Sequence, residues 1–327
     1  ESDLEDGIYK GLLEGLNDPY SVYYTAEEYR KMMEQTSGTY SGIGALVSQN
    51  AETGIITVVK AFADAPAAKA GVKNGDIIYK VKGKEVTGVD INNVVTEMKG
   101  EKGTTVDITV YRESEKKYID FTITRDQVNE PTVEYKMLDK KKKIGYIQIS
   151  QFEEVTYDQF TKALDDLKKQ GMKAVIFDVR SNPGGLYETV CKMLDEILPE
   201  GNLVSTKDKY GNEEKQTSDS KCLDMPMVVL QNKDSASASE IFAGAIQDFN
   251  AGKIVGTQSF GKGIVQTILP LSDGSAVKLT VQDYYTPSGK NIHGKGITPD
   301  VEAELEENAT SDTQLEKAKE TIMELMK

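Results

Sequence analysis

The chain has 327 residues, a formal net charge of −14 at pH 7 and 38% hydrophobic residues. This length exceeds one ordinary domain and predicts two or three domains. The acidic charge excludes DNA and RNA as ligands, because nucleic-acid binding depends on Lys and Arg displacing counterions from phosphates.

Cysteine and histidine counts exclude further classes of protein. The two cysteines, Cys191 and Cys222, cannot form a disulfide framework or a zinc site built on thiolates. With His293 as the single imidazole, a metal site would have to be rich in carboxylates, and a histidine-based triad would have to use that residue. No apolar run reaches the ~20 residues that a membrane span requires. The polar first residues lack the pattern of a signal peptide, so we expect that a targeting segment has been removed.

Residues 1–37 form the first predicted segment. Apolar and charged residues alternate there at helical spacing, which predicts two helices. Between the helices, Asp18-Pro19 is a turn signal and the run from Thr25 to Glu28 is a good helix start. We expect this helical N-terminal segment to pack on a later domain or to pair with a second copy of the chain.

From residue 38 to 127 short β segments follow one another around Gly-rich turns, with helical pieces at 66–71 and 91–100. This order, together with YSGIGALV (residues 40–47) and APAAKAGVKNGDIIYKVKGKEV (residues 65–86), resembles a PDZ domain of bacterial proteases. PDZ domains bind a peptide's terminal carboxylate with the amides of a Gly-containing loop, and the peptide extends the sheet. The resemblance places this peptide-binding loop at Ser41, Gly42, Ile43 and Gly44, with Ile43 and Leu46 near the pocket for the last side chain.

Strands and helices alternate in residues 128–327, which predicts an α/β layered core with some parallel pairing. An acidic, helix-prone tail runs from Glu304 to Lys327. The strands are expected at 144–152, 173–180, 227–232, 253–257, 263–271 and 276–285, and the helices at 157–170, 186–198 and after the serines of the string KDSASASEIFAGAIQDF (residues 233–249).

Those serines lie between a predicted strand and a predicted helix. Ser237 and Glu240 form an S-x-x-E capping box, and a serine in this position is most often only a helix cap. Amides at a helix N-terminus can also stabilise an oxyanion, and ligand sites favour the carboxyl ends of strands in α/β sheets. One serine could therefore be a nucleophile, provided that a neighbouring group accepts its proton.

Two residues are candidates for that base. His293 lies in the loop GKNIHGKGITPD, and Lys262 lies in SFGKGIVQ, where burial would have to lower its pKa from ~10.4 toward neutrality. In an extended segment Lys262 and Gln266 would project from one face, so the Gln266 amide could orient the amine. Spacing alone leaves the choice between Lys and His open.

The combination of SASASEIFAGAIQDFNAGKIVGTQSFGKGIVQ (residues 235–266), DVRSNPGG (residues 178–185) and the PDZ-like region resembles the carboxyl-terminal processing proteases. These are PDZ-containing serine endopeptidases with a Ser-Lys dyad. The resemblance implies a ClpP/crotonase-like α/β protease core (128–327), an inserted PDZ domain (38–127) and the helical N-terminal segment (1–37).

The same resemblance assigns the site residues by motif position. It makes Ser237 the nucleophile, Lys262 the general base and Gln266 the residue that supports the lysine. The oxyanion donors would be the amide of Ala238 and the amide of Gly184 or Gly185. His293 is then structural.

This family implies an endopeptidase that cleaves protein substrates, recognises their free C-termini through the PDZ domain, is gated by that domain and needs no cofactor or metal. Relatives act outside the cytoplasm, often behind an amino-terminal anchor, so we expect an extracytoplasmic protein whose membrane contact lies in a missing segment. The helical ends, Leu4–Met33 and Glu304–Met326, are candidates for homodimer contacts or for packing on their own core. Two alternatives are an inert PDZ peptide-binding scaffold and a hydratase-like enzyme, but a scaffold does not need this Ser-Lys-Gln set and a hydratase does not need a PDZ domain.

Overall fold

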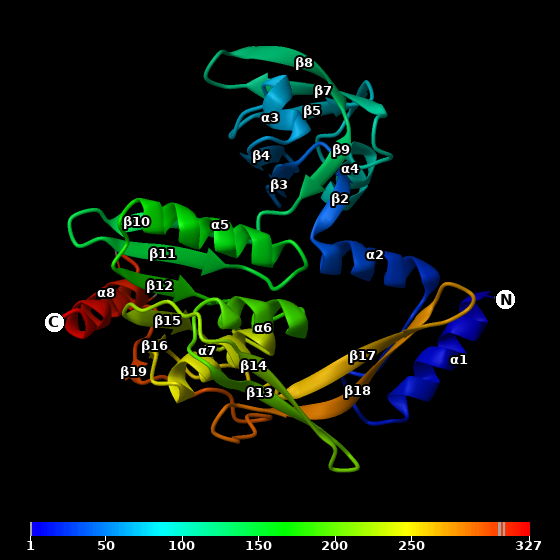
Figure 1. The fold of residues 1–327 in the computed structure, drawn as a ribbon. Helices are drawn as coiled ribbons and strands as arrows, with labels where there is room; N and C mark the ends of the chain where they lie inside the picture. The colour runs from blue at the N-terminus through cyan, green and yellow to red at the C-terminus, as the bar shows by residue number, and fades with distance from the viewer. Residues whose placement is uncertain (1, 307–308, 310) are drawn as a thin grey trace. The chain divides into compact units, whose positions relative to one another are not determined.

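The computed structural model describes residues 2–306, 309 and 311–327 (Figure 1). Contacts divide the chain into two compact units, of which one is Gly38–Pro131 and the other joins the segment before Gly38 to the segment after Pro131. The predicted inserted domain ends at residue 127, whereas the observed unit ends at residue 131.

A six-stranded, mostly parallel sheet forms the centre of the larger unit. Only its β10–β11 pair is antiparallel, and the other neighbours pair in parallel. Its strands, in spatial order, are β10 (Val133–Asp139), β11 (Ile144–Ile149), β12 (Ala174–Asp178), β15 (Met227–Gln231), β16 (Gly252–Gly256) and β19 (Val301–Glu302).

Helices cover both faces of this sheet, because its central strands β12 and β15 are buried at every position. Phe177 of β12 packs in a cluster with residues of three helices, whereas its neighbour Ile176 packs on the other face with Ala318 and Ile322 of the last helix. The helices are α5 (Thr156–Lys169), α6 (Tyr187–Asp195) and α7 (Ala238–Asp248) on the first face and α8 (Thr313–Leu325) on the second.

A second, antiparallel sheet lies in the same unit, and its longest strand, β18, pairs with three others. Its strands are β1 (Val22–Tyr24), β18 (Ala276–Tyr285), β13 (Gly201–Asp208) and β14 (Glu213–Ser218), with β17 (Ile264–Pro270) also paired to β18 (Figure 1). The sequence analysis did not predict β1, β13 or β14. β1 has three residues, and β14 is polar and almost entirely exposed, so neither carries an alternating apolar pattern.

The predicted helical ends differ in their surroundings. Helix α1 (Ser2–Glu14) and the turn after it expose Leu4, Ile8, Leu12 and Leu16 at four-residue spacing, while α2 (Ala26–Ser37) follows β1. Helix α8, by contrast, buries Ala318 and Ile322 against its own sheet. It is also shorter than predicted, and residues 307, 308 and 310 of the expected tail lie outside the described part. A homodimer through α1 stays a prediction, which sedimentation of the intact chain can check.

The smaller unit is a β-rich domain with its own apolar core. Strand β3 is at one edge of its main sheet, so its outer backbone groups are available to pair with a further strand. The elements are β2 (Thr39–Gly42), β3 (Ala45–Gln49), β4 (Ile56–Ala61), α3 (Pro66–Ala70), β5 (Ile77–Val81), β6 (Lys84–Glu85), α4 (Ile91–Met98), β7 (Thr105–Arg112), β8 (Lys117–Thr124) and β9 (Asp126–Asn129).

The cysteines and the helix lengths can be compared with the expectations from the sequence. Cys191 is buried, Cys222 is exposed, and both are free thiols. Across the described residues, no helix combines the length and the hydrophobicity that crossing a bilayer would require.

Candidate active site

The loops that follow β12 and β15 meet at the carboxyl edge of the parallel sheet. The carbonyl of Asn182, in the first loop, accepts hydrogen bonds from the Ala236 amide (3.0 Å) and the Ser239 hydroxyl (2.9 Å) of the second. The Ser235 hydroxyl donates to the Val179 carbonyl at 2.8 Å. Two of the three motif serines, Ser235 and Ser239, therefore join the two loops.

Ser237 differs from its two neighbours. Ser235 and Ser239 are 1% and 0% exposed, whereas Ser237 is only half-buried and lines a cavity of about 940 Å³. Its backbone has φ 55° and ψ −113°, a sparsely populated conformation for a residue with a side chain. The buried Tyr284 hydroxyl donates to the Ser237 carbonyl at 3.1 Å, which helps to hold this strained backbone.

Lys262 lines the same cavity and contacts Gln266. The amine Nζ donates to Gln266 Oε1 at 3.1 Å, although Lys262 lies in the loop before β17 rather than in the strand. Across the described residues, no hydrogen bond joins Lys262 Nζ to the Ser237 hydroxyl. Gly263 lets this loop approach the next one closely, because a Cβ there would lie 2.6 Å from the His293 amide.

The surroundings of Lys262 favour a neutral amine. Burial lowers the pKa of Lys262, the positive charge of Lys278 on β18 lowers it further, and the Asp18 carboxylate raises it in part. The side chain is half-buried, so the pKa lies below its usual value of 10.5. A lysine can act as a general base only in its neutral form, and this shift increases that fraction at a given pH.

Glu240 connects the serine helix to the lysine loop. Its side chain is fully buried, and each carboxylate oxygen accepts two hydrogen bonds. Oε2 accepts from the amides of Ser237 (2.8 Å) and Lys262 (2.8 Å). Oε1 accepts from the Ser259 hydroxyl (2.6 Å) and the Gly261 amide (2.7 Å). The residue that the sequence indicated only as a helix cap therefore fixes the Ser237 segment against the Lys262 segment.

The Asn-Pro-Gly-Gly loop lies against Ser237. A Cβ on Gly184, whose φ is 106°, would come within 2.8 Å of Ser237 Cβ, so only glycine fits there. The Gly184 amide already donates to Asn182 Oδ1 at 2.8 Å. The amides of Gly185 and Ala238 donate to no acceptor among the described residues, which leaves these two available for a substrate oxyanion.

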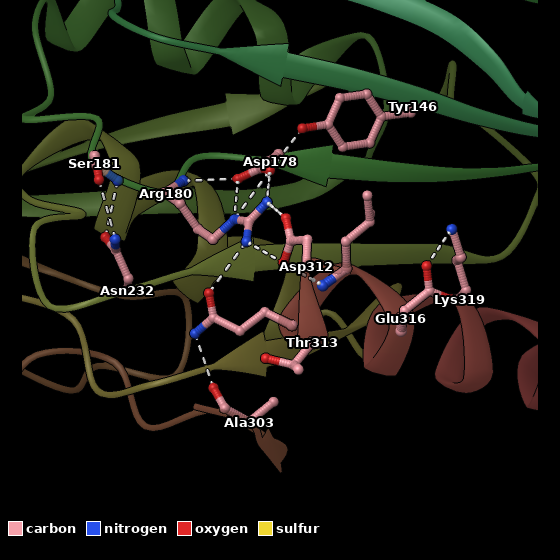
Figure 2. Close-up of polar contacts among 12 residues, drawn as sticks. Tyr146, Asp178, Arg180, Ser181, Asn232, Ala303, Asp312, Thr313, Glu316 and Lys319 are labelled. Atoms are coloured by element: carbon pink, nitrogen blue, oxygen red, sulfur yellow. Dashed lines mark hydrogen bonds and ion pairs between the residues drawn. The ribbon is translucent and has the colours of Figure 1, made fainter. Parts of the chain in front are cut away.

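Arg180 anchors the start of this loop (Figure 2). Its guanidinium donates to Asp178 Oδ2 at 2.6 Å and to both oxygens of Asp312, the N-cap of α8. Asp178 is 1% exposed and also accepts from the Tyr146 hydroxyl at 2.7 Å. This cluster ties the end of β12, the loop and α8 together, and a buried charge of this kind is tolerated because each member is paired.

His293, the alternative candidate for the base, does not line the cavity of Ser237 and Lys262. His293 is exposed and lines a different cavity, which it shares with Tyr20 and Phe260. Within the described residues, no group of three or more His, Cys, Asp or Glu side chains could hold a metal ion.

In the smaller unit, the predicted peptide-binding loop, Ser41 to Gly44, begins with the last two residues of β2, and Ile43 and Gly44 join that strand to the edge strand β3. Ile43 is buried in the domain core, whereas Leu46 on β3 is 51% exposed. The amides of Ile43 and Gly44 donate to no acceptor in the described part of the chain.

Comparisons with known proteins agree with this architecture. A family model described as "Peptidase family S41" matches residues 143–303, and one described as "PDZ domain" matches residues 41–123. The larger unit is therefore an S41 peptidase core, and the domain inserted in it is a PDZ domain.

Individual relatives match over nearly the whole chain. A carboxy-terminal-processing protease of Bartonella bacilliformis is 40% identical over 309 residues, which cover 92% of this chain and 70% of that protein. A Staphylococcus epidermidis protein named "Probable CtpA-like serine protease" is 40% identical, with coverage of 91% and 60%. The solved photosystem II D1 C-terminal processing protease aligns with a TM-score of 0.56 at 29% identity, over 96% of this chain and 84% of that chain.

The chain therefore belongs to the carboxy-terminal-processing proteases of peptidase family S41, a family of serine proteases. It spans 70% and 60% of the lengths of the two sequence relatives.

Replacing Glu240 tests its connecting role. In Glu240→Gln, the amide NH₂ would face two donors, so we expect a loss of about 1–3 kcal/mol in the free energy of unfolding. We also expect peptidase activity to fall about 100-fold, because Ser237 and Lys262 lose their shared anchor. Urea unfolding and cleavage rates measure the two effects. Glu316→Gln, an exposed change on α8, is the control, and equal behaviour of the two variants would contradict this role.

Lys278 offers a test by pH. With Lys262 as the general base that the resemblance implies, the rate rises as pH passes upward through the Lys262 pKa, because only the neutral amine accepts a proton. Lys278→Met removes a positive charge that lowers this pKa, while the Asp18 carboxylate that raises it remains, so the pKa rises and the ascending limb of kcat/KM moves to higher pH. Lys278→Arg keeps the charge and should leave the limb in place. A shift of the Met variant to lower pH would show that this assignment of charges is wrong.

Proposed function

We propose that this chain is a Ser-Lys endopeptidase. The Ser237 hydroxyl attacks the scissile carbonyl carbon while Lys262 takes the hydroxyl proton. The amides of Ala238 and Gly185 stabilise the oxyanion, and Lys262 passes the proton to the leaving amine as the acyl-enzyme forms. Water then hydrolyses the acyl-enzyme. The observation that carries the proposal is that Ser237 and the Lys262–Gln266 pair line one cavity, with the Gly185 and Ala238 amides available beside the serine.

We further propose that the PDZ domain binds the free C-termini of substrates. The amides of Ile43 and Gly44 would receive the carboxylate, and the peptide would pair with the edge strand β3. In the present arrangement Lys262 Nζ contacts Gln266 and not Ser237. A bound tail would activate the enzyme if it favours an arrangement in which the amine reaches the serine hydroxyl. The extracytoplasmic location stays a prediction from the resemblance alone.

Cleavage assays test the dyad. Ser237→Ala and Lys262→Ala should each reduce cleavage of casein below about 0.1% of the wild-type rate, because nucleophile and base act as a unit. His293→Ala should retain activity. A serine-directed phosphonate should label the wild type and not Ser237→Ala, as seen by mass spectrometry of the intact chain. Activity in Lys262→Ala together with an inactive His293→Ala would exclude the lysine, and an inert, unlabelled wild type would support the scaffold alternative.

Peptide stimulation tests the PDZ proposal. A peptide with a free, apolar C-terminus should raise the cleavage rate, and the same peptide with a C-terminal amide should not, because it lacks the carboxylate. Leu46→Asp, an exposed change on β3, should abolish stimulation and leave basal activity within about twofold. Equal stimulation by both peptides would contradict carboxylate recognition.

A further inference from the structure

The turn between α1 and β1 reaches the base from a distant part of the chain. Gln266 Nε2 donates to the Tyr20 carbonyl at 2.6 Å, across 246 positions of sequence. Lys262 Nζ also lies over the Tyr20 ring, 4.7 Å from its centroid. The backbone and the side chain of one residue therefore contact both members of the Lys-Gln pair.

This turn is held firmly on the second sheet. The Asp18 carboxylate accepts from the Tyr20 amide (3.1 Å) and the Ser21 hydroxyl (2.6 Å). The Ser21 hydroxyl in turn accepts from the Thr280 amide of β18 at 3.1 Å. Directly after the turn, β1 pairs with β18. The Tyr20 carbonyl is thus fixed relative to β18, and β17, which carries Gln266, pairs with the same strand.

The carbonyl decides which way the Gln266 amide faces. A glutamine side chain has one acceptor oxygen and one NH₂ donor, and a backbone carbonyl can only accept. The NH₂ group must therefore face Tyr20, and this leaves Oε1 toward Lys262, as observed. With the amide reversed, its oxygen would face the Tyr20 carbonyl, so two acceptors would face each other and the hydrogen bond from Lys262 Nζ to Oε1 would be lost.

We propose that Tyr20 is a positioning residue for the catalytic base: its carbonyl orients Gln266, and its ring bounds the space of the Lys262 amine. The inference rests on the proposed role of Lys262 as the base. It makes the N-terminal segment part of the catalytic apparatus, because Tyr20 positions the Lys-Gln pair that acts on Ser237. The bulk of the ring restricts where the amine can lie, and the aromatic face attracts the amine only in its protonated form, after proton transfer.

Three variants test this role. Tyr20→Phe keeps the backbone and the ring, so kcat should stay within about twofold of the wild type. Tyr20→Ala removes the ring, frees the amine and loosens the turn, so kcat should fall about 10- to 100-fold while KM changes less than about threefold. Tyr9→Ala is the matched control, because it removes an aromatic contact of the same N-terminal segment, the stacking on Tyr23 at 5.2 Å, without touching Lys262 or Gln266.

The outcomes separate this inference from the proposed function. All variants are measured as full chains, with kcat and KM on a peptide substrate and thermal unfolding in parallel. Equal losses of kcat in Tyr20→Ala and Tyr9→Ala, or an unchanged kcat in Tyr20→Ala, would overturn the role of Tyr20. Retained activity in Lys262→Ala would instead overturn the dyad itself. A loss specific to Tyr20→Ala, rescued by Phe, supports the positioning role.

Discussion

The buried carboxylate of Glu240 is the contact on which the site depends. A buried ionised carboxylate is costly unless its oxygens are paired, and here four donors from two segments satisfy it. Helix α7 and the loop before β17 cannot separate without leaving that charge unpaired. The hydrogen bonds that the Ser237 and Lys262 amides donate to this buried carboxylate therefore hold the two segments next to each other.

Each of the two sheets in the larger unit positions part of the candidate site. The parallel sheet positions Ser237 and the Asn-Pro-Gly-Gly loop at its carboxyl edge. Hydrogen bonds of the Asn182 and Arg180 side chains hold this loop against the sheet. The antiparallel sheet carries Gln266 on β17 and Lys262 in the loop before that strand, with Lys278 on the adjacent strand. Glu240 joins the two supports, and the cavity lies along their junction.

Much of this could be predicted from the sequence, and the exceptions have physical reasons. The buried parallel strands β12 and β15 are apolar runs that end in one polar residue, and the apolar residues of α7 recur at helical spacing after the serines, so both elements were visible as sequence patterns. Strands β1 and β14 were not, because one is very short and the other is polar and exposed.

Side-chain contacts were harder to predict than elements. Motif position suggested Ser237, Lys262 and Gln266, and the structure brings the last two into contact. Tyr20 and Gln266 are 246 residues apart in the sequence, and no local sequence pattern predicts a contact between them. Glu240 was predicted as part of a helix cap. Its hydrogen bonds to the lysine loop are tertiary contacts, which the spacing of residues in the sequence does not reveal.

The insertion of the PDZ domain has a mechanical consequence. Its first link leaves from α2, whose Thr36 lines the cavity and accepts from the Glu154 amide at 3.2 Å. Its second link enters at Thr132, whose carbonyl accepts from the Ser150 amide, next to the cavity residue Gln151. The first covalent link thus ends at a cavity residue, and the second ends at a residue bonded to the neighbour of one, so both links of the inserted domain attach to segments that contribute to the cavity.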